Sequence, residues 1–186
     1  MQILRIFDTL TEKEKEVDTS GTIRIYVCGV TVYDESHIGH ARTIIVFDTL
    51  RRFLEYQGKK VQFIQNFTDV DDKIINRAKQ ENIPPLELSS KYIIRYFEDF
   101  DRLNIKRADM HPKATEHIQD MIGLVQDLVE KKIAYVSKNG VYFSVSKFKE
   151  YGKLSKKRID DLISGARIEV DETKNNPLDF ALCKFE

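Results

Sequence analysis

A cysteine and two histidines lie close together near the start of the chain, in the stretch VCGVTVYDESHIGHARTIIVFD that begins at Val27. His37 and His40 are three residues apart, which on a helical turn places both imidazole rings on one face. The first turn of a helix also has backbone N–H groups without partners and a partial positive charge, so an anion is favoured there. The two histidines and the expected helix start therefore predict a site for the phosphate groups of a nucleotide.

The same residues have a plausible part in a reaction. When a nucleophile attacks a phosphate, negative charge grows on the phosphate oxygens, and hydrogen-bond donors placed there lower the barrier. His37 and His40 are therefore candidate catalytic residues, with Gly39 between them. The alternative is a pair of surface histidines at the start of a helix.

Three further candidates follow expected strands. Cys28 stands at the carboxyl end of the first strand, where open α/β sheets bind ligands, although most free cysteines are small buried side chains. Thr68 and Asp69 follow the second strand. Thr68 can hydrogen-bond to a bound ligand and Asp69 can offset a positive charge on it, or both can cap the next helix. Asp71 and Asp72 are expected to be structural.

The elements that must position these residues alternate between strand and helix. Residues 22–27 are strand-like, residues 40–57 form a periodic apolar helix that ends at Gly58, and residues 61–64 form a second strand. A strand, a helix and a strand within about 45 residues indicate a βαβ unit with parallel strands. Helices are then expected over residues 70–80 and, opened by Pro84 and Pro85, up to residue 104.

The pattern changes after Arg107. It predicts a helix over residues 115–131, a β-hairpin over 134–145 that turns at Asn139 and Gly140, and a buried strand over 177–185. His111 and His117 are expected to be ordinary packing or surface residues. The fold class is therefore α/β, a Rossmann-like parallel sheet (its N-terminal half) with an α+β insertion. The expected boundaries are 1–108 for the first half of the nucleotide-binding domain, 109–176 for the insertion and 177–186 for a strand that returns to the parallel sheet.

Composition limits the classes of partner. The 186 residues include 30 basic and 30 acidic side chains, so nucleic-acid binding requires a local patch. The compact basic cluster consists of Lys153, Lys156, Lys157 and Arg158, which fits contact with the phosphates of a nucleic acid or a solvated surface. The two cysteines cannot make a disulfide framework, and no signal peptide or membrane span is expected. These features predict a cytoplasmic protein.

Several segments together resemble the N-terminal part of cysteinyl-tRNA synthetases, which are class I aminoacyl-tRNA synthetases. They are, in order, YVCGVTVYDESHIGHARTIIVFDTLRRFL, NFTDVDDKIINRA, KATEHI, YGKLSKKRIDDLISGARIEV and PLDFAL. The resemblance implies a ligase of protein biosynthesis, which uses ATP with Mg²⁺ to activate cysteine and then transfers it to tRNA(Cys). It implies ATP binding by His37, Gly39 and His40, and cysteine binding by Cys28, Gly29, Thr68 and Asp69.

The resemblance also implies a zinc ion held by Cys28, which takes the substrate thiolate directly. Zinc prefers sulfur and lowers the pKa of a thiol, so it selects cysteine over serine. The family's other zinc ligands, its KMSKS loop and its tRNA-reading helical domain are absent up to Glu186. The expectation is therefore a fragment that binds zinc weakly and is inactive alone. Cys183 replaces a tryptophan that is usual in the family.

Two other functions stay open. One is the cysteine ligase of mycothiol synthesis, which shares the adenylation chemistry. The other is a truncated paralogue that binds nucleotide or protein without turnover. The basic cluster and the long insertion favour tRNA as the partner over the small-molecule ligase. The sequence does not indicate an oligomeric state.

Overall fold

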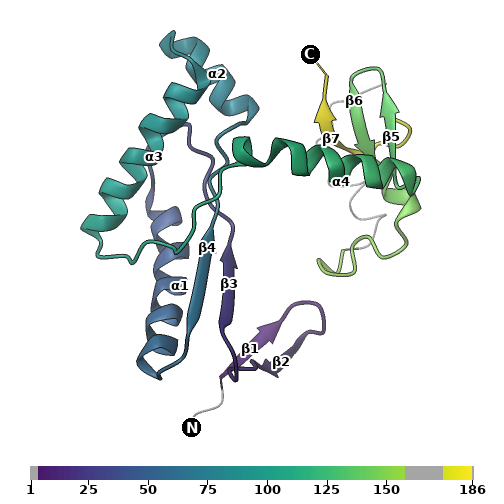
Figure 1. Ribbon diagram of the computed structural model, residues 1–186. Helices are drawn as coiled ribbons and strands as arrows, with labels where there is room; N and C mark the ends of the chain where they lie inside the picture. Colours follow the sequence, from purple (N-terminus) through teal and green to yellow (C-terminus); the bar gives the residue numbers. More distant parts are fainter. Residues whose placement is uncertain (1–3, 158–173, 186) are drawn as a thin grey trace. The chain divides into compact units, whose positions relative to one another are not determined.

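The computed structural model describes residues 4–157 and 174–185, which form two compact units (Figure 1). One unit is made of residues 18–118, and the other combines residues 1–17 with residues 119–186. In chain order the strands are β1 (Arg5–Asp8), β2 (Lys13–Glu16), β3 (Ile23–Val27), β4 (Val61–Gln65), β5 (Ala134–Ser137), β6 (Gly140–Phe143) and β7 (Phe180–Lys184). The α-helices are α1 (Ile38–Tyr56), α2 (Asp72–Glu81), α3 (Pro85–Arg102) and α4 (Ile118–Glu130), and two 3₁₀ turns cover Ala114–His117 and Val145–Lys147.

The unit of residues 18–118 contains the expected βαβ element. Strands β3 and β4 pair in parallel from Ile23 opposite Val61 to Val27 opposite Gln65, and α1 connects them. Gly58, with φ of +76°, ends α1 in the left-handed conformation expected of it. The α/β class with a parallel sheet is therefore confirmed.

A third extended segment, residues 109–113, lies on the other edge of β4. The sequence analysis assigned these residues to the insertion. Parallel bridges join Ile64 to Met110 and Phe67 to Lys113, and the Asp109 N–H donates to Phe63 O at 2.8 Å. Residues 109–113 therefore extend the parallel sheet. The expected boundary at residue 108 is too early, and the compact unit continues to residue 118.

The core of this unit lies between the sheet and the three helices α1, α2 and α3. Its buried side chains include Leu88, Tyr92, Tyr96 and Phe100 from α3, and Ile74 from α2. Pro85 begins α3 as predicted, since a proline at the first helical position loses no hydrogen bond. Helix α2 begins later than predicted, because Asp71 is its N-cap and accepts from the Lys73 N–H at 2.8 Å. The capping alternative for Thr68 and Asp69 is therefore wrong.

An arginine of α1 connects this helix to the third segment. The Arg51 side chain is 3% exposed and donates to Asp109 at 2.6 Å and to the carbonyl oxygen of Arg107 at 2.8 Å. Asp109 in turn accepts from the Phe63 N–H at 2.7 Å. Burial raises the pKa of Asp109, but this hydrogen bond and the Arg51 charge outweigh it and hold the pKa below its usual value. The ion pair thus links α1 to the segment of residues 109–113. Asp109 in turn links that segment to β4 through the Phe63 N–H.

The other unit contains the hairpin β1–β2 and the antiparallel sheet β5–β6–β7. The predicted hairpin is present, but Ser137 pairs with Gly140, so the turn is Lys138 and Asn139, one residue earlier than expected. Strand β7 pairs with β6, where Val141 lies opposite Cys183. The expected return of residues 177–186 to the parallel sheet is therefore wrong for β7.

A buried carboxylate explains why β7 stays with the hairpin. Asp179 is 2% exposed and accepts from the Val145 N–H at 3.0 Å and the Tyr135 hydroxyl at 2.9 Å. The Tyr135 oxygen accepts in turn from the Asn175 N–H at 2.8 Å. Because a buried carboxylate is costly without such donors, these hydrogen bonds hold the segment before β7 against β5 and β6.

Candidate active site

The four residues predicted to bind cysteine, Cys28, Gly29, Thr68 and Asp69, follow the carboxyl ends of β3 and β4. Cys28 follows the last residue of β3 and is exposed, so its predicted place at the strand end is confirmed. Its short distance to His37 and His40 stays a prediction. The parallel pairing resumes after Cys28, because the Thr68 N–H donates to Val30 O at 3.0 Å and the Val32 N–H donates to Thr68 O at 3.2 Å.

The chain between the two paired stretches contains a bulge. Val27 pairs with Gln65 and Thr31 pairs with Thr68, so three intervening residues (28–30) on one chain face two (66–67) on the other. One extra residue bends a strand and redirects its side chains. The bulged residues 28–30 include Cys28 and Gly29, for which the sequence predicted ligand binding.

The two histidines form the start of α1 together. His37 is the N-cap, and its Nδ1 accepts from the Gly39 N–H at 3.1 Å. His40 closes the capping box, because its Nδ1 accepts from the His37 N–H at 3.3 Å. The rings stack with centroids 3.7 Å apart and planes inclined by 20°. The helix thus begins earlier than the predicted residue 40, and the histidines satisfy two of its free N–H groups.

These hydrogen bonds also decide where each neutral imidazole carries its proton. A neutral imidazole has one donor and one acceptor nitrogen, so a ring whose Nδ1 accepts must carry its proton on Nε2. Burial lowers the pKa of His40, and the neighbouring His37 lowers it further. His40 is therefore neutral at pH 7, and the capping box leaves the Nε2–H groups of His37 and His40 as donors.

Gly39 makes the stacked arrangement possible. A Cβ at this position would lie 2.8 Å from Cε1 and 2.9 Å from Nδ1 of His37, closer than real Cβ contacts allow. Any larger residue would push the His37 ring away from the N–H group that it caps. The glycine of the His-Ile-Gly-His element is thus required by the close approach of the ring.

Asp69 lies at the same strand end but its carboxylate is used within the protein. The residue is 3% exposed and accepts from the Thr115 N–H at 2.9 Å and the Thr115 hydroxyl at 2.5 Å. These bonds hold the 3₁₀ turn that precedes α4. Thr68 is half-buried beside it, with its backbone paired to residues 30 and 32. Unlike the carboxylate of Asp69, the side chain of Thr68 takes no part in these hydrogen bonds.

A metal site is not formed by the described residues. Within residues 4–157 and 174–185, no group of three or more histidine, cysteine, aspartate or glutamate side chains could hold a metal ion. A structural or catalytic zinc site needs at least three protein ligands, and Cys28 is one. Zinc therefore does not fit these residues alone, and its binding by Cys28 stays a prediction.

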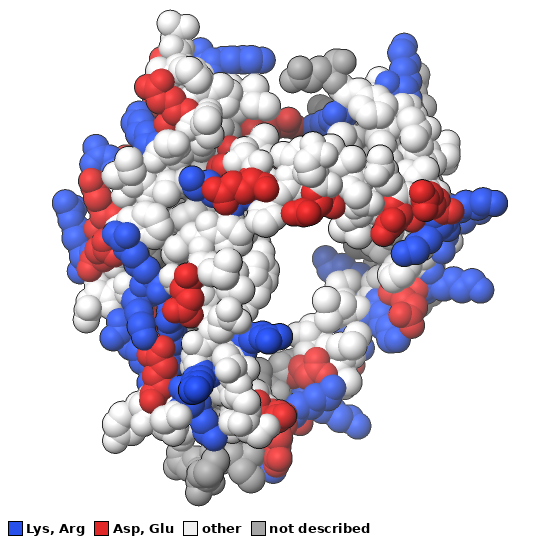
Figure 2. Space-filling model, in the orientation of Figure 1, with Lys and Arg blue, Asp and Glu red and all other residues white. Residues whose placement is uncertain are grey.

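The predicted basic cluster is partly neutralised by its neighbours. Lys153 pairs with Glu150 at 2.8 Å, and Lys156 donates to Leu10 O at 2.8 Å and lies 3.9 Å from Glu12. Lys157 is exposed, and Arg158 lies outside the described residues. Acidic and basic side chains are intermixed on the face shown in Figure 2. A role of the cluster in tRNA binding stays a prediction.

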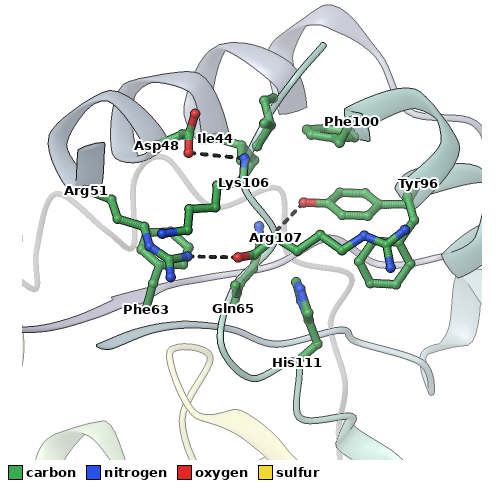
Figure 3. A pocket seen from close by; sticks show the side chains of 13 residues that line it. Ile44, Asp48, Arg51, Phe63, Gln65, Tyr96, Phe100, Lys106, Arg107 and His111 are labelled. Carbon is green, nitrogen blue, oxygen red and sulfur yellow. Dashed lines mark hydrogen bonds between the residues drawn. The ribbon is translucent and has the colours of Figure 1, made fainter. Parts of the chain in front are cut away.

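A small cavity with a mainly apolar lining lies inside the unit of residues 18–118, and the sequence analysis did not predict it. It measures about 10 Å³ and lies between α1, β4 and α3 (Figure 3). Tyr96 donates to Gln65 Oε1 at 2.9 Å, while Gln65 Nε2 and both ring nitrogens of His111 meet no partner with hydrogen-bond geometry among the described residues. Burial raises the pKa of Tyr96 to about 12.

His111 packs in this region as the sequence suggested. Its ring stacks on Phe67 with centroids 5.2 Å apart and meets the Phe97 ring edge-to-face at 5.1 Å. Burial lowers the pKa of His111, more than the nearby backbone of Gln65 raises it, and the positive charge of Arg107 lowers it further. His111 is therefore a neutral packing residue at pH 7.

Comparison with known proteins decides the family. A sequence model of the family described as tRNA synthetases class I (C) catalytic domain matches residues 14–186. The chain belongs to this family. Proteins named cysteine–tRNA ligase are similar to it over 97% of its length, with 56% identity in Thermodesulfovibrio yellowstonii, 54% in Carboxydothermus hydrogenoformans and 55% in Aquifex aeolicus. The chain spans 38%, 39% and 37% of those relatives.

Solved structures show the same fold in other class I synthetases. Methionyl-tRNA synthetase of Mycobacterium tuberculosis matches 68% of this chain with a TM-score of 0.58 and 19% identity, using 25% of its own length. The leucyl-tRNA synthetase AgnB2 of Agrobacterium radiobacter matches 70% with a TM-score of 0.56 and 20% identity, using 18% of its length. The parallel sheet of this synthetase domain is therefore Rossmann-like, as predicted. No helix of the described residues is long and apolar enough to cross a membrane.

Proposed function

We propose that this chain forms part of the catalytic domain of a cysteine–tRNA ligase, which activates cysteine with ATP and transfers it to tRNA(Cys). The observation that carries the proposal is the stacked pair of His37 and His40 at the start of α1, directly after the strand that ends at Cys28. The relatives named cysteine–tRNA ligase support the same reaction.

The histidines act on ATP. Attack of the cysteine carboxylate on the α-phosphate places extra negative charge on its oxygens. The Nε2–H groups of His37 and His40, together with the positive end of α1, stabilise that charge. Because the capping box holds both rings before ATP binds, the donors need no reorganisation during the reaction. Removing one such donor typically costs about 3 kcal/mol of barrier.

Cys28 and its neighbours recognise the amino acid. The exposed thiol of Cys28 lies at the end of β3, and Thr68 follows the adjacent strand β4. Gly29 lets the backbone come close to the substrate, because it has no side chain. In this proposal Thr68 contacts the ammonium region of the substrate. Asp69 acts indirectly, because its carboxylate binds Thr115 and so fixes the backbone next to Thr68. Zinc would supply selectivity for a thiolate, with Cys28 as one of its ligands.

The proposal is tested by cysteine-dependent ATP–pyrophosphate exchange with the protein that carries this chain. We expect exchange with cysteine and little with serine. The His40→Ala variant should lower kcat by about 10²-fold or more. His117→Ala serves as the control, because His117 is exposed on the 3₁₀ turn before α4. Absence of exchange in the unmodified protein, or full exchange after His40→Ala, would contradict the proposal.

A further inference from the structure

Asn66 holds the bulge that carries Cys28 through its side chain. The side-chain oxygen Oδ1 accepts from the Gly29 N–H at 2.8 Å and from the Tyr26 hydroxyl at 3.0 Å. Tyr26 and Gly29 lie on either side of the dipeptide Val27-Cys28, so a single oxygen binds the chain before and after the cysteine. A bulge leaves an N–H without a partner in the ladder, and Asn66 satisfies it at Gly29.

The backbone of Asn66 also packs closely against the bulge, at Gly29. A Cβ on Gly29 would lie 1.5 Å from the carbonyl oxygen of Asn66, so the two backbones approach as closely as only glycine permits. The backbone approach and the two hydrogen bonds act on the same side of Cys28. The chain direction at Cys28 is thus set by one residue that directly follows the neighbouring strand β4.

We propose that Asn66 is the positioning residue for the Cys28 thiol and so contributes to recognition of the substrate thiol. This inference rests on the proposed function, in which Cys28 recognises cysteine. Asn66 also lies two residues before Thr68 in the chain, separated from it by Phe67. It therefore links the part of the site that contains Cys28 to Thr68. A shift of about 1 Å in such a group is enough to lower substrate use strongly.

Three variants separate the two hydrogen bonds. Asn66→Ala removes both, Tyr26→Phe removes only the tyrosine bond, and Asn66→Asp retains an oxygen acceptor in the same place. We expect Asn66→Ala to raise the KM for cysteine by about tenfold, with kcat and the KM for ATP within about twofold of the unmodified enzyme. Tyr26→Phe should have a smaller effect, and Asn66→Asp should restore most of the affinity.

A second measurement tests the position of the thiol without any activity. The 186 residues contain two cysteines, so a Cys183→Ser background leaves Cys28 as the one thiol of this part of the protein, and peptide mapping assigns alkylation to Cys28. We expect alkylation of Cys28 by iodoacetamide to be about threefold faster or more in Asn66→Ala, because the bulge that holds the thiol becomes mobile. Exchange of the Gly29 amide hydrogen should also accelerate in Asn66→Ala and stay slow in Tyr26→Phe.

The outcomes distinguish this inference from the proposed function. If the unmodified protein shows no exchange activity while Asn66→Ala alters alkylation and amide exchange, the proposed function fails and the positioning role stands. If Asn66→Ala leaves alkylation and the KM for cysteine unchanged, or raises the KM values for cysteine and ATP equally, the positioning role is overturned. Should Asn66→Ala not fold, Asn66→Ser replaces it, because its shorter side chain cannot reach both donors.

Discussion

Asp69 and Thr115 are joined by two hydrogen bonds to a buried carboxylate, one from the Thr115 N–H at 2.9 Å and one from its hydroxyl at 2.5 Å. The pair connects the carboxyl end of β4 to the turn before α4. Asp69 lies directly after Thr68, a predicted substrate contact, so the same strand end serves both the candidate site and the beginning of the insertion.

The first prediction concerns the stability of this connection. Asp69→Ala leaves the Thr115 N–H without its partner and should lower the free energy of unfolding by about 3 kcal/mol. Thr115→Val retains the N–H bond and should cost about 1 kcal/mol. Urea denaturation of both single variants and the double variant measures the coupling. Additive effects of the two changes would contradict the direct interaction.

The second prediction concerns the backbone contact at the bulge. Gly29→Ala forces a Cβ to within 1.5 Å of Asn66 O, which backbone cannot accommodate without moving. We expect a loss of about 3 kcal/mol or more in the free energy of unfolding. Gly21→Ala is the matched control, because a Cβ there has no neighbour within 4 Å. Equal thermal stability of the two variants would show that the bulge relaxes freely.

The third prediction separates the capping and chemical roles of His37. His37→Asn keeps a good N-cap acceptor but removes the ring, whereas His37→Leu removes both. We expect Asn to retain stability and Leu to lose about 1 kcal/mol, measured by thermal unfolding. Both variants should lose exchange activity, since neither has the imidazole donor. An active His37→Asn enzyme would assign this residue to capping alone.

The fourth prediction concerns pH. The pKa of His111 is lowered in the folded protein, mainly by burial, from an ordinary value of 6.5. The unfolded chain therefore binds a proton first, so folding stability decreases as the pH falls below about 6.5 and is fully retained above it. Arg107 adds to this effect because its charge repels protonated His111.

The measurement is the free energy of unfolding between pH 7.5 and pH 5, compared as a difference between variants. We expect His111→Gln to reduce the loss of stability on acidification relative to the unmodified protein. An identical pH dependence in His111→Gln and the unmodified protein would show that the protonation of this ring is not linked to folding.

The sequence by itself determined the elements whose signals are local. Apolar periodicity placed α1 and α3, alternation placed β3 and β4, and Asn139 and Gly140 placed the hairpin β5–β6 to within one residue. The order of strand and helix then implied parallel pairing, because a helical crossover returns the chain in the same direction. The spacing of His37 and His40 is also a local signal, because both residues lie on one helical turn. It was sufficient to predict that the two rings lie together.

The tertiary structure alone decided the features that depend on residues far apart in the chain. Asp69 looked like a helix cap, but Thr115, 46 residues later, binds its carboxylate. Residues 109–113 looked like the start of an insertion, yet they pair with β4. These contacts carry no periodic signal, because each consists of a few hydrogen bonds or bridges between residues far apart in the chain.

The same limit explains the error at β7 and the missed role of Asn66. A short apolar run such as Phe180–Lys184 fits any sheet edge, and the buried Asp179 selects β6 through donors on β5 and on the turn after β6. In the sequence Asn66 is simply a polar residue after a strand. Only the bulge opposite it places two donors, the Tyr26 hydroxyl and the Gly29 N–H, at its side-chain oxygen. Local patterns thus specify the elements, whereas buried polar groups need partners from elsewhere in the chain and so decide how those elements join.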